Sequence, residues 1–138
     1  MVEEFRIRFE GKARVVARYG DLEIATDQRP EGGGEGTAPE PFTLFLASLG
    51  TCAGIYVRKF CETRGISTSG IQLTQTLLPD AADARRIGTV RIAIRLPDDF
   101  PSQYRDAVIR AAEGCAVKKY IQNPFRIETV VTPATGER

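Results

Sequence analysis

The sequence predicts an α+β fold in which antiparallel strands come in runs around one long buried helix. Apolar and charged residues alternate through residues 3–27 and much of residues 66–96, a pattern typical of strands. Between these runs, residues 42–65 form the most apolar stretch and are apolar almost all round between Phe42 and Val57, which is typical of a buried helix. Strands grouped in this way indicate an α+β domain. Because domains commonly contain about 100–200 residues, we expect a single domain over residues 1–138.

The first run of strands is expected to form a three-stranded antiparallel meander. Phe5, Ile7 and Phe9 alternate with charged neighbours and so share one face of a strand. After a glycine turn, residues 13–18 and 22–26 supply the two further strands.

A loop follows at residues 28–41, which contain four Gly and three Pro. Glycine gives the backbone conformational freedom, so we expect this loop to be mobile. A loop of this length inside a compact domain is often functional.

The apolar helix has recognisable ends. Pro41 stands where a first-turn proline belongs, and Gly65 stands where a C-terminal cap belongs. The run is interrupted by polar residues and is expected to be too short to span a membrane. Gly50 and Gly54 flank Cys52, and such small residues permit close approach of another backbone or a ligand. So small a chain has too little sheet to cover this helix, so we expect a homodimer that buries two such helices together.

The second half of the chain contains further strands and a pair of helices. Strands are expected over residues 66–78 and 86–96. A helix begins at Pro101, and Gly114 separates it from a second helical segment that Pro124 ends. Residues 125–131 are expected to form the last strand.

The composition excludes several kinds of site. The sequence has three Cys and no His. It therefore lacks a Ser-His-Asp triad, a Cys-His dyad and a His-based metalloprotease helix. Three Cys without His cannot supply the four ligands of a structural zinc site. We expect neither a metal nor a cofactor.

The charge and the cysteine count bear on partners and location. Nineteen Lys and Arg against eighteen Asp and Glu give a net charge of +1. This balance provides no long-range attraction to nucleic acid or to anionic lipid. The charged N-terminus lacks the apolar core of a signal peptide, and an odd number of cysteines does not indicate a secreted disulfide framework. We therefore expect a cytoplasmic protein.

The three cysteines differ in their expected roles. Cys52 and Cys61 are nine residues apart, so they lie on opposite faces of one helix and cannot pair. Cys61 is interpreted as a packing residue. Cys115 follows Gly114 at a predicted helix start, with lysines in the next turn, and both features lower a thiol pKa. From the residues alone, Cys115 therefore ranks above Cys52 as the more reactive thiol.

Two segments, PFTLFLASLGTCAG and EGCAVKKYIQNPF, together resemble the OsmC/Ohr superfamily of osmotically inducible and organic hydroperoxide resistance proteins. The resemblance implies an intertwined α+β homodimer with two long central helices. It implies thiol-dependent reduction of organic hydroperoxides, with Cys52 as the peroxidatic and Cys115 as the resolving cysteine. It also implies that neither metal nor flavin takes part and that a dithiol or a lipoylated protein is the reductant.

In this family an Arg from the N-terminal region stabilises the reactive thiolate, and a Glu in the first turn of the central helix holds that Arg. The corresponding helix positions are Phe42 and Thr43 here, so the carboxylate is missing there. Glu40 lies nearby but precedes Pro41, outside the helix. The candidate arginines are Arg14, Arg18 and Arg29, of which we prefer Arg29 and Arg18.

Other residues on the Cys52 face suggest a pocket. Phe45, Leu49 and Tyr56 lie on that face of the predicted helix, where they either pack an interface or form the apolar wall of a hydroperoxide pocket. Two hypotheses follow. The first is a thiol peroxidase in which Cys52 and Cys115 form a disulfide. The alternative is a non-catalytic dimeric module on the same fold that binds an apolar small molecule, which the missing Glu favours.

Overall fold

The structure is a computed structural model that describes residues 3–134. It divides into two compact units. Unit 1 contains the residues up to Thr51 together with Gln72–Ile94, and unit 2 contains Cys52–Ile71 together with the residues from Arg95 onward. Each unit is described by itself. A single domain over residues 1–138 stays a prediction.

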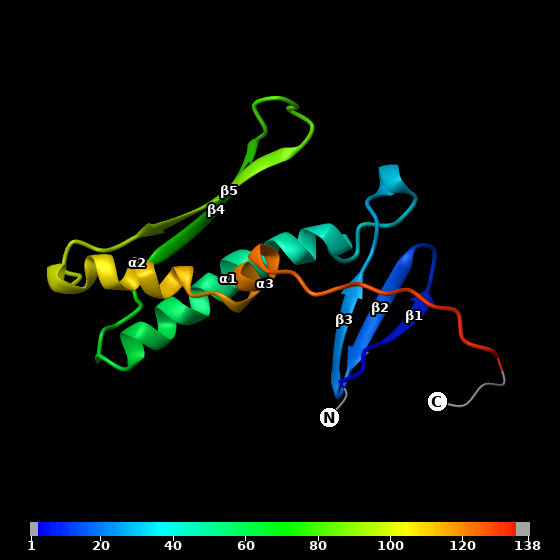
Figure 1. Cartoon of the computed structure of the whole chain (residues 1–138), viewed down its shortest axis with the longest axis horizontal. Coiled ribbons are helices and arrows are strands. Elements are labelled where there is room, and N and C mark those ends of the chain that lie inside the picture. Colours follow the sequence, from blue (N-terminus) through cyan, green and yellow to red (C-terminus); the bar gives the residue numbers. More distant parts are fainter. Residues whose placement is uncertain (1–2, 135–138) are drawn as a thin grey trace. The chain divides into compact units, whose positions relative to one another are not determined.

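Unit 1 begins with the predicted meander (Figure 1). Strands β1 (Arg6–Glu10), β2 (Arg14–Tyr19) and β3 (Leu22–Thr26) form an antiparallel sheet in the order β1-β2-β3. Ala17 faces Ile7 on one neighbour and Ile24 on the other. This register places the alternating apolar residues on one face of the sheet, so the prediction for residues 3–27 is confirmed.

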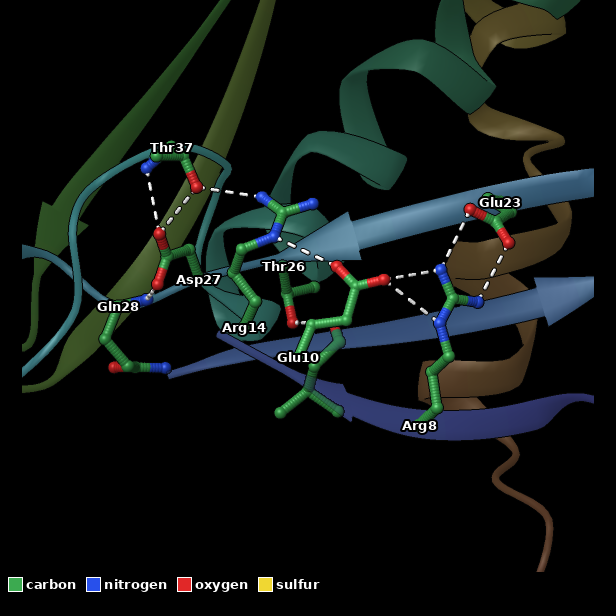
Figure 2. A network of polar contacts seen from close by, with 9 residues as sticks. Arg8, Glu10, Arg14, Glu23, Thr26, Asp27, Gln28 and Thr37 are labelled. Atoms are coloured by element: carbon green, nitrogen blue, oxygen red, sulfur yellow. Dashed lines mark hydrogen bonds and ion pairs between the residues drawn. The ribbon is translucent and has the colours of Figure 1, made fainter. Parts of the chain in front are cut away.

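The two faces of this sheet differ sharply. The apolar face is uncovered in the described chain: Ile7 is 60% exposed, Phe9 87% and Leu22 66%. The other face carries charged pairs, in which Arg8 binds both Glu10 and Glu23 at 2.7–2.8 Å (Figure 2). A bare apolar sheet face on this scale indicates a surface that another element covers.

Helix α1 spans Pro41–Glu62 and begins at the predicted proline. Its end is a Schellman turn: Gly65 has φ +67°, and the Ile66 N–H donates to the Cys61 carbonyl at 2.9 Å. Gly65 thus caps the helix as predicted, and α1 itself ends at Glu62.

The prediction that this helix is buried is not met by the described chain alone. Within α1 only Ala53, Val57 and Cys61 are buried, and 22% of its most apolar stretch is covered. The expectation that the run is too short for a membrane was wrong, because α1 has 22 residues and is long and apolar enough to span one. The core helices of soluble proteins share these properties.

Strands β4 (Gln72–Pro79) and β5 (Ile87–Arg95) form a two-stranded sheet. The second strand agrees with the prediction for residues 86–96. The first starts six residues later than predicted, because the Ile71 N–H donates to the Thr68 carbonyl at 3.0 Å and Gly70 adopts φ +85°. A turn therefore occupies residues 68–71, which the period-2 pattern had assigned to the strand.

Unit 2 contains the predicted helical pair. A 3₁₀ turn, η2 (Ser102–Tyr104), leads into α2 (Arg105–Glu113), and α3 (Ala116–Gln122) follows after a break at Gly114. The buried residues of this unit come from α1, α2 and the turns between the elements. They are Ala53, Val57, Cys61, Phe100, Val108, Ala112 and Cys115. The small core thus lies where the second half of α1, α2 and the start of α3 supply apolar side chains.

The prediction of a last strand over residues 125–131 was wrong for the described chain. These residues have no regular secondary structure, and their side chains are exposed; Ile127 is 81% and Val131 98% exposed. A strand exists only where a neighbour accepts its backbone hydrogen bonds, and the described residues provide none here.

Candidate active site

Two of the three cysteines meet in unit 2. Cys52 lies on α1, and Cys115 is the residue before α3. All three cysteines are free thiols. The thiols of Cys52 and Cys115 interact: the Cys115 thiol lowers the pKa of Cys52, and Cys52 raises that of Cys115. Two thiols that shift one another's pKa lie near each other, and proximity is the first requirement for a disulfide.

The surroundings of Cys52 favour its thiolate. Burial by itself would raise the pKa of the Cys52 thiol. Three hydrogen bonds oppose it: one from the Cys115 thiol, and one each from the backbone N–H groups of Val117 and Ala116. Together they hold the pKa of Cys52 below its usual value. The first backbone amides of α3 thus act on the sulfur of Cys52, which belongs to α1. Cys52 is half-buried, so its thiol remains accessible.

The same contact has the opposite effect on Cys115. Burial raises the pKa of this thiol, and the hydrogen bond that it donates to Cys52 raises it further. The backbone N–H groups of Lys118 and Val117 lower it, but not enough to offset those two causes. Cys115 is only 3% exposed and keeps its proton.

The expectation that Cys115 has a lowered pKa was therefore wrong, because its pKa is raised and that of Cys52 is lowered. Cys115 does precede a helix. However, the backbone amides of Ala116 and Val117, at the start of that helix, also lower the pKa of Cys52. Lys118 acts on the Cys115 sulfur through its backbone N–H. The pair is polarised: the pKa of Cys52 is shifted downward and that of Cys115 upward.

Cys61 takes no part in this pair. It is fully buried near the end of α1, and burial raises the pKa of its thiol. The interpretation of Cys61 as a packing residue is confirmed.

In unit 1 the structure brings together two of the three residues proposed to stabilise the thiolate. Arg29 and Glu40 form an ion pair, with Arg29 Nε 3.3 Å from Glu40 Oε1. Arg18 is engaged elsewhere, because its Nε donates to the Gly20 carbonyl at 3.0 Å. Glu40 lies just outside α1, as predicted. Its carboxylate nevertheless pairs with Arg29, which the side chains of Phe42 and Thr43 could not do.

The loop that carries this ion pair is organised by Asp27, which the sequence analysis did not single out (Figure 2). The Asp27 carboxylate accepts hydrogen bonds from the Gln28 N–H at 2.7 Å, the Thr37 N–H at 3.0 Å and the Thr37 hydroxyl at 2.7 Å. These bonds, that of the Thr37 hydroxyl foremost, lower the pKa of Asp27 to about 2. An Asp directly before a Gly-rich loop is a turn signal that could have found it.

The proposed pocket residues are distributed over both units. Phe45 and Leu49 belong to the unit 1 part of α1, where Phe45 is 44% exposed and its ring lies 5.9 Å from that of Phe42. Tyr56 belongs to unit 2 and is half-buried. Residues 3–134 contain no group of three or more His, Cys, Asp or Glu side chains suited to holding a metal ion.

These observations define an α+β protein with a polarised pair of thiols. The sequence profile of the family named OsmC-like protein matches residues 33–130, which is more than half of the chain. The chain therefore belongs to the OsmC-like family, as its sequence resemblance indicated.

Solved structures agree with this family. A protein from Psychrobacter arcticus 273-4, whose proposed role is in the osmotic stress and detoxification response, is 26% identical with a TM-score of 0.68; the match covers 86% of this chain and 87% of that one. An OsmC-like protein from Mycoplasma pneumoniae is 12% identical, with a TM-score of 0.61 and coverage of 90% and 89%.

A more distant match is the organic hydroperoxide resistance protein OsmC from Legionella pneumophila, 20% identical, with a TM-score of 0.51 and coverage of 88% and 90%. The last two matches share the fold. No curated protein is similar enough in sequence to count as a relative.

Proposed function

We propose that this protein is a thiol peroxidase that reduces organic hydroperoxides, and hydrogen peroxide more weakly. The observation that carries the proposal is the polarised thiol pair. The Cys52 sulfur receives three hydrogen bonds that stabilise its thiolate, and one of them comes from the thiol with which it would form a disulfide. Membership in the OsmC-like family supports the proposal, since organic hydroperoxide resistance proteins share the fold.

The reaction has three balanced steps. First, the Cys52 thiolate attacks the terminal oxygen of the hydroperoxide. The O–O bond breaks, the alkoxide leaves and takes a proton from water, and Cys52 becomes a sulfenic acid. Second, the Cys115 sulfur attacks Cys52, the S–O bond breaks, and the hydroxide leaves with the Cys115 proton as water. Third, an external dithiol exchanges with the Cys52–Cys115 disulfide, so that the dithiol is oxidised and both thiols are restored.

The polarity of the pair suits this order of events. The attacking thiol needs to be a thiolate at neutral pH, and the environment of Cys52 lowers its pKa. The resolving thiol has to stay available while Cys52 reacts, and the buried, protonated Cys115 does so. Proton transfer needs no imidazole, so a sequence without His is compatible with this chemistry.

The ion pair of Arg29 and Glu40 is the second part of the proposal. Arg29 is the residue proposed to stabilise the thiolate, with Glu40 holding its guanidinium. Phe45, Leu49 and Tyr56 would supply an apolar wall for the organic part of the hydroperoxide. The electron donor would be a small dithiol or a lipoylated protein.

We also propose that the working unit is a homodimer. The apolar face of the β1-β2-β3 sheet, most of α1 and the segment 125–131 expose large hydrophobic side chains in the single chain. Monomeric proteins rarely leave contiguous apolar patches of this kind uncovered. A second copy would bury these surfaces. A cytoplasmic location is proposed with it, because free thiols persist in a reducing compartment.

The experiment is consumption of cumene hydroperoxide by the purified protein with dihydrolipoamide as the reductant. The wild type is expected to turn over, Cys52→Ser to lose all activity, and Cys115→Ser to lose sustained turnover. Cys61→Ala is the matched control and is expected to retain activity, because this thiol is buried away from the pair. Undiminished turnover by Cys52→Ser would refute the proposal. A wild type that is inactive with every dithiol would favour the binding module for an apolar molecule instead.

A further inference from the structure

Asp27 is an unusual residue in the described chain. It lies directly after β3 and is 1% exposed, the one buried charged side chain among residues 3–134. Buried carboxylates are costly unless they are paired or fully hydrogen-bonded. This carboxylate accepts from the Gln28 N–H, the Thr37 N–H and the Thr37 hydroxyl (Figure 2). Its charge therefore joins the start of the Gly-rich loop to a residue near the end of that loop.

The loop also closes on itself through its backbone. The Asp27 N–H donates to the Pro39 carbonyl at 3.1 Å, so the chain that leaves β3 meets itself again shortly before α1. Inside this closure the Gly36 N–H donates to the Gln28 carbonyl at 2.9 Å. Compact surface loops of about 6–16 residues whose ends lie together are known as Ω-loops. Residues 27–39 form such a loop, in which hydrogen bonds connect one limb to the other.

The centre of the loop is closely packed at Gly34, which is buried. A methyl group added there would overlap the Gln28 carbonyl oxygen and would lie 2.6 Å from Asp27 Oδ1. The Gly34 N–H donates to the Arg29 carbonyl at 3.1 Å. The glycine content led us to expect a mobile loop, but this glycine allows the two limbs to pack against each other.

Thr37 fixes the loop to the sheet as well as to Asp27. Its hydroxyl donates to Asp27 Oδ2 at 2.7 Å and accepts from the Arg14 guanidinium at 2.8 Å (Figure 2). Arg14 lies on β2 and is paired in turn with Glu10, Nε to Oε1 at 3.3 Å. One hydroxyl thus uses both its donor and its acceptor capacity between a cation and a carboxylate. Hydrogen bonds to charged groups are stronger than those between the neutral backbone groups of the loop.

We propose that residues 27–39 form a strap that opens and closes as a unit, with the contact between Asp27 and Thr37 as its latch. Separating Thr37 from Asp27 leaves a buried carboxylate without two of its donors. Gly34 covers one carboxylate oxygen, so water can replace the lost donors only if the centre of the loop moves as well. Opening of one part of the strap therefore favours opening of the rest, which is the behaviour of a local cooperative unit. The inference concerns unit 1 alone and does not depend on the proposed function.

The substitution that tests the latch is Asp27→Asn. One Asp27 oxygen accepts from Gln28, and the other accepts two bonds from Thr37. In the variant one of these oxygens becomes an NH₂ group, which donates and cannot accept. The charge is lost, and either Gln28 or Thr37 loses its acceptor.

The test measures hydrogen exchange of single amides by NMR, at Gly34 and Gly36. Their own acceptors are the carbonyl oxygens of Arg29 and Gln28, so the substitution at Asp27 removes neither hydrogen bond. If the strap opens as a unit, both amides share one opening equilibrium with Thr37 in the wild type. Asp27→Asn should then lower the protection of both alike, by roughly 10- to 100-fold, the effect of one hydrogen bond to a charged acceptor.

Two references accompany this measurement. The amides of β2, the central strand of the sheet, should keep their wild-type protection, which shows that unit 1 remains folded. The control variant is Asp21→Asn, which removes the same charge in the turn before β3 and should leave Gly34 and Gly36 unchanged. Thr37→Val removes only the hydroxyl of the latch, and it replaces Asp27→Asn if that variant does not fold. It should lower the protection of the same two glycine amides.

Three results would overturn the inference. The first is wild-type protection of Gly34 and Gly36 in a folded latch variant, because the latch would then not control the strap. The second is a different opening equilibrium for each loop amide in the wild type, which would mean that the loop frays residue by residue. The third is an equal loss of protection in β2, which would mean that the whole sheet is destabilised. None of these measurements involves turnover, so failure of the proposed peroxidase function is recognised separately by the hydroperoxide assay.

Discussion

The contact between Gln75 and helix α1 allows a prediction whose size follows from the structure. The Gln75 side chain donates from Nε2 to the Leu46 carbonyl at 2.9 Å, two turns before the reactive part of the helix. It fits there because Gly50 has no side chain: a methyl group at Gly50 would lie 2.6 Å from Gln75 Oε1. Gly50→Ala would therefore displace the amide and break this hydrogen bond.

Two opposing effects determine the stability of Gly50→Ala. Alanine in a helix interior is favoured over glycine by about 0.5–1 kcal/mol. Loss of the hydrogen bond costs about 0.5–1.5 kcal/mol. The single variant should therefore lie close to the wild type, within about 1 kcal/mol. In a Gln75→Ala background the bond is already absent, so Gly50→Ala should stabilise by about 0.5–1 kcal/mol.

The assay is urea unfolding followed by circular dichroism. All four proteins are kept at one protomer concentration, because the proposed homodimer would make stability depend on concentration. The coupling between the two sites should be about 0.5–1.5 kcal/mol. Equal stabilisation by Gly50→Ala in both backgrounds would refute the reasoning, since it would mean that Gln75 makes no useful contact with the helix.

Three further predictions concern the thiols, the loop and the end of α1. Cys115→Ala removes the S–H donor, so it should raise the pKa of Cys52 and slow its alkylation at pH 7; an unchanged pH profile would contradict this hydrogen bond. The pKa of Asp27, lowered to about 2, means that its ionised form stabilises the fold above pH about 4 and that this stabilisation is lost as the pH falls toward about 2. Acid unfolding followed by circular dichroism should therefore be less steep in Asp27→Asn, and an identical curve would count against the role of the carboxylate. Arg64 lies 3.8 Å above the centre of the Phe60 ring, so Arg64→Ala should lower stability in urea by about 0.5–1 kcal/mol, whereas no loss would mean that the contact is unimportant.

Local patterns in the sequence predicted most of the elements. The strands of residues 3–27 were found because their alternation and their turns are encoded next to one another in the chain. Pro41 and Gly65 marked the ends of α1 for the same reason. Residues 125–131 have an equally good strand pattern, but a strand also needs a neighbour, and the pattern cannot supply one.

The site was predicted less well than the fold, because its chemistry depends on contacts between distant residues. The lowered pKa was expected at Cys115 and is found at Cys52, since the sequence shows which residue precedes a helix but not that the helix amides also donate to the other sulfur. Arg29 and Glu40 were named separately, and the structure pairs them. Asp27 was missed because an Asp before a Gly-rich loop signals a turn but not a buried carboxylate; its burial and its bonds to Thr37 are seen in the structure.

The most direct test of the central claim is a thiol count and intact mass after one equivalent of cumene hydroperoxide, added without reductant. The account predicts that two of the three thiols disappear, that the mass falls by two hydrogens per chain, and that peptide mapping finds a disulfide between Cys52 and Cys115 with Cys61 still free. Three intact thiols after complete exposure to the hydroperoxide, or a disulfide that includes Cys61, would contradict it.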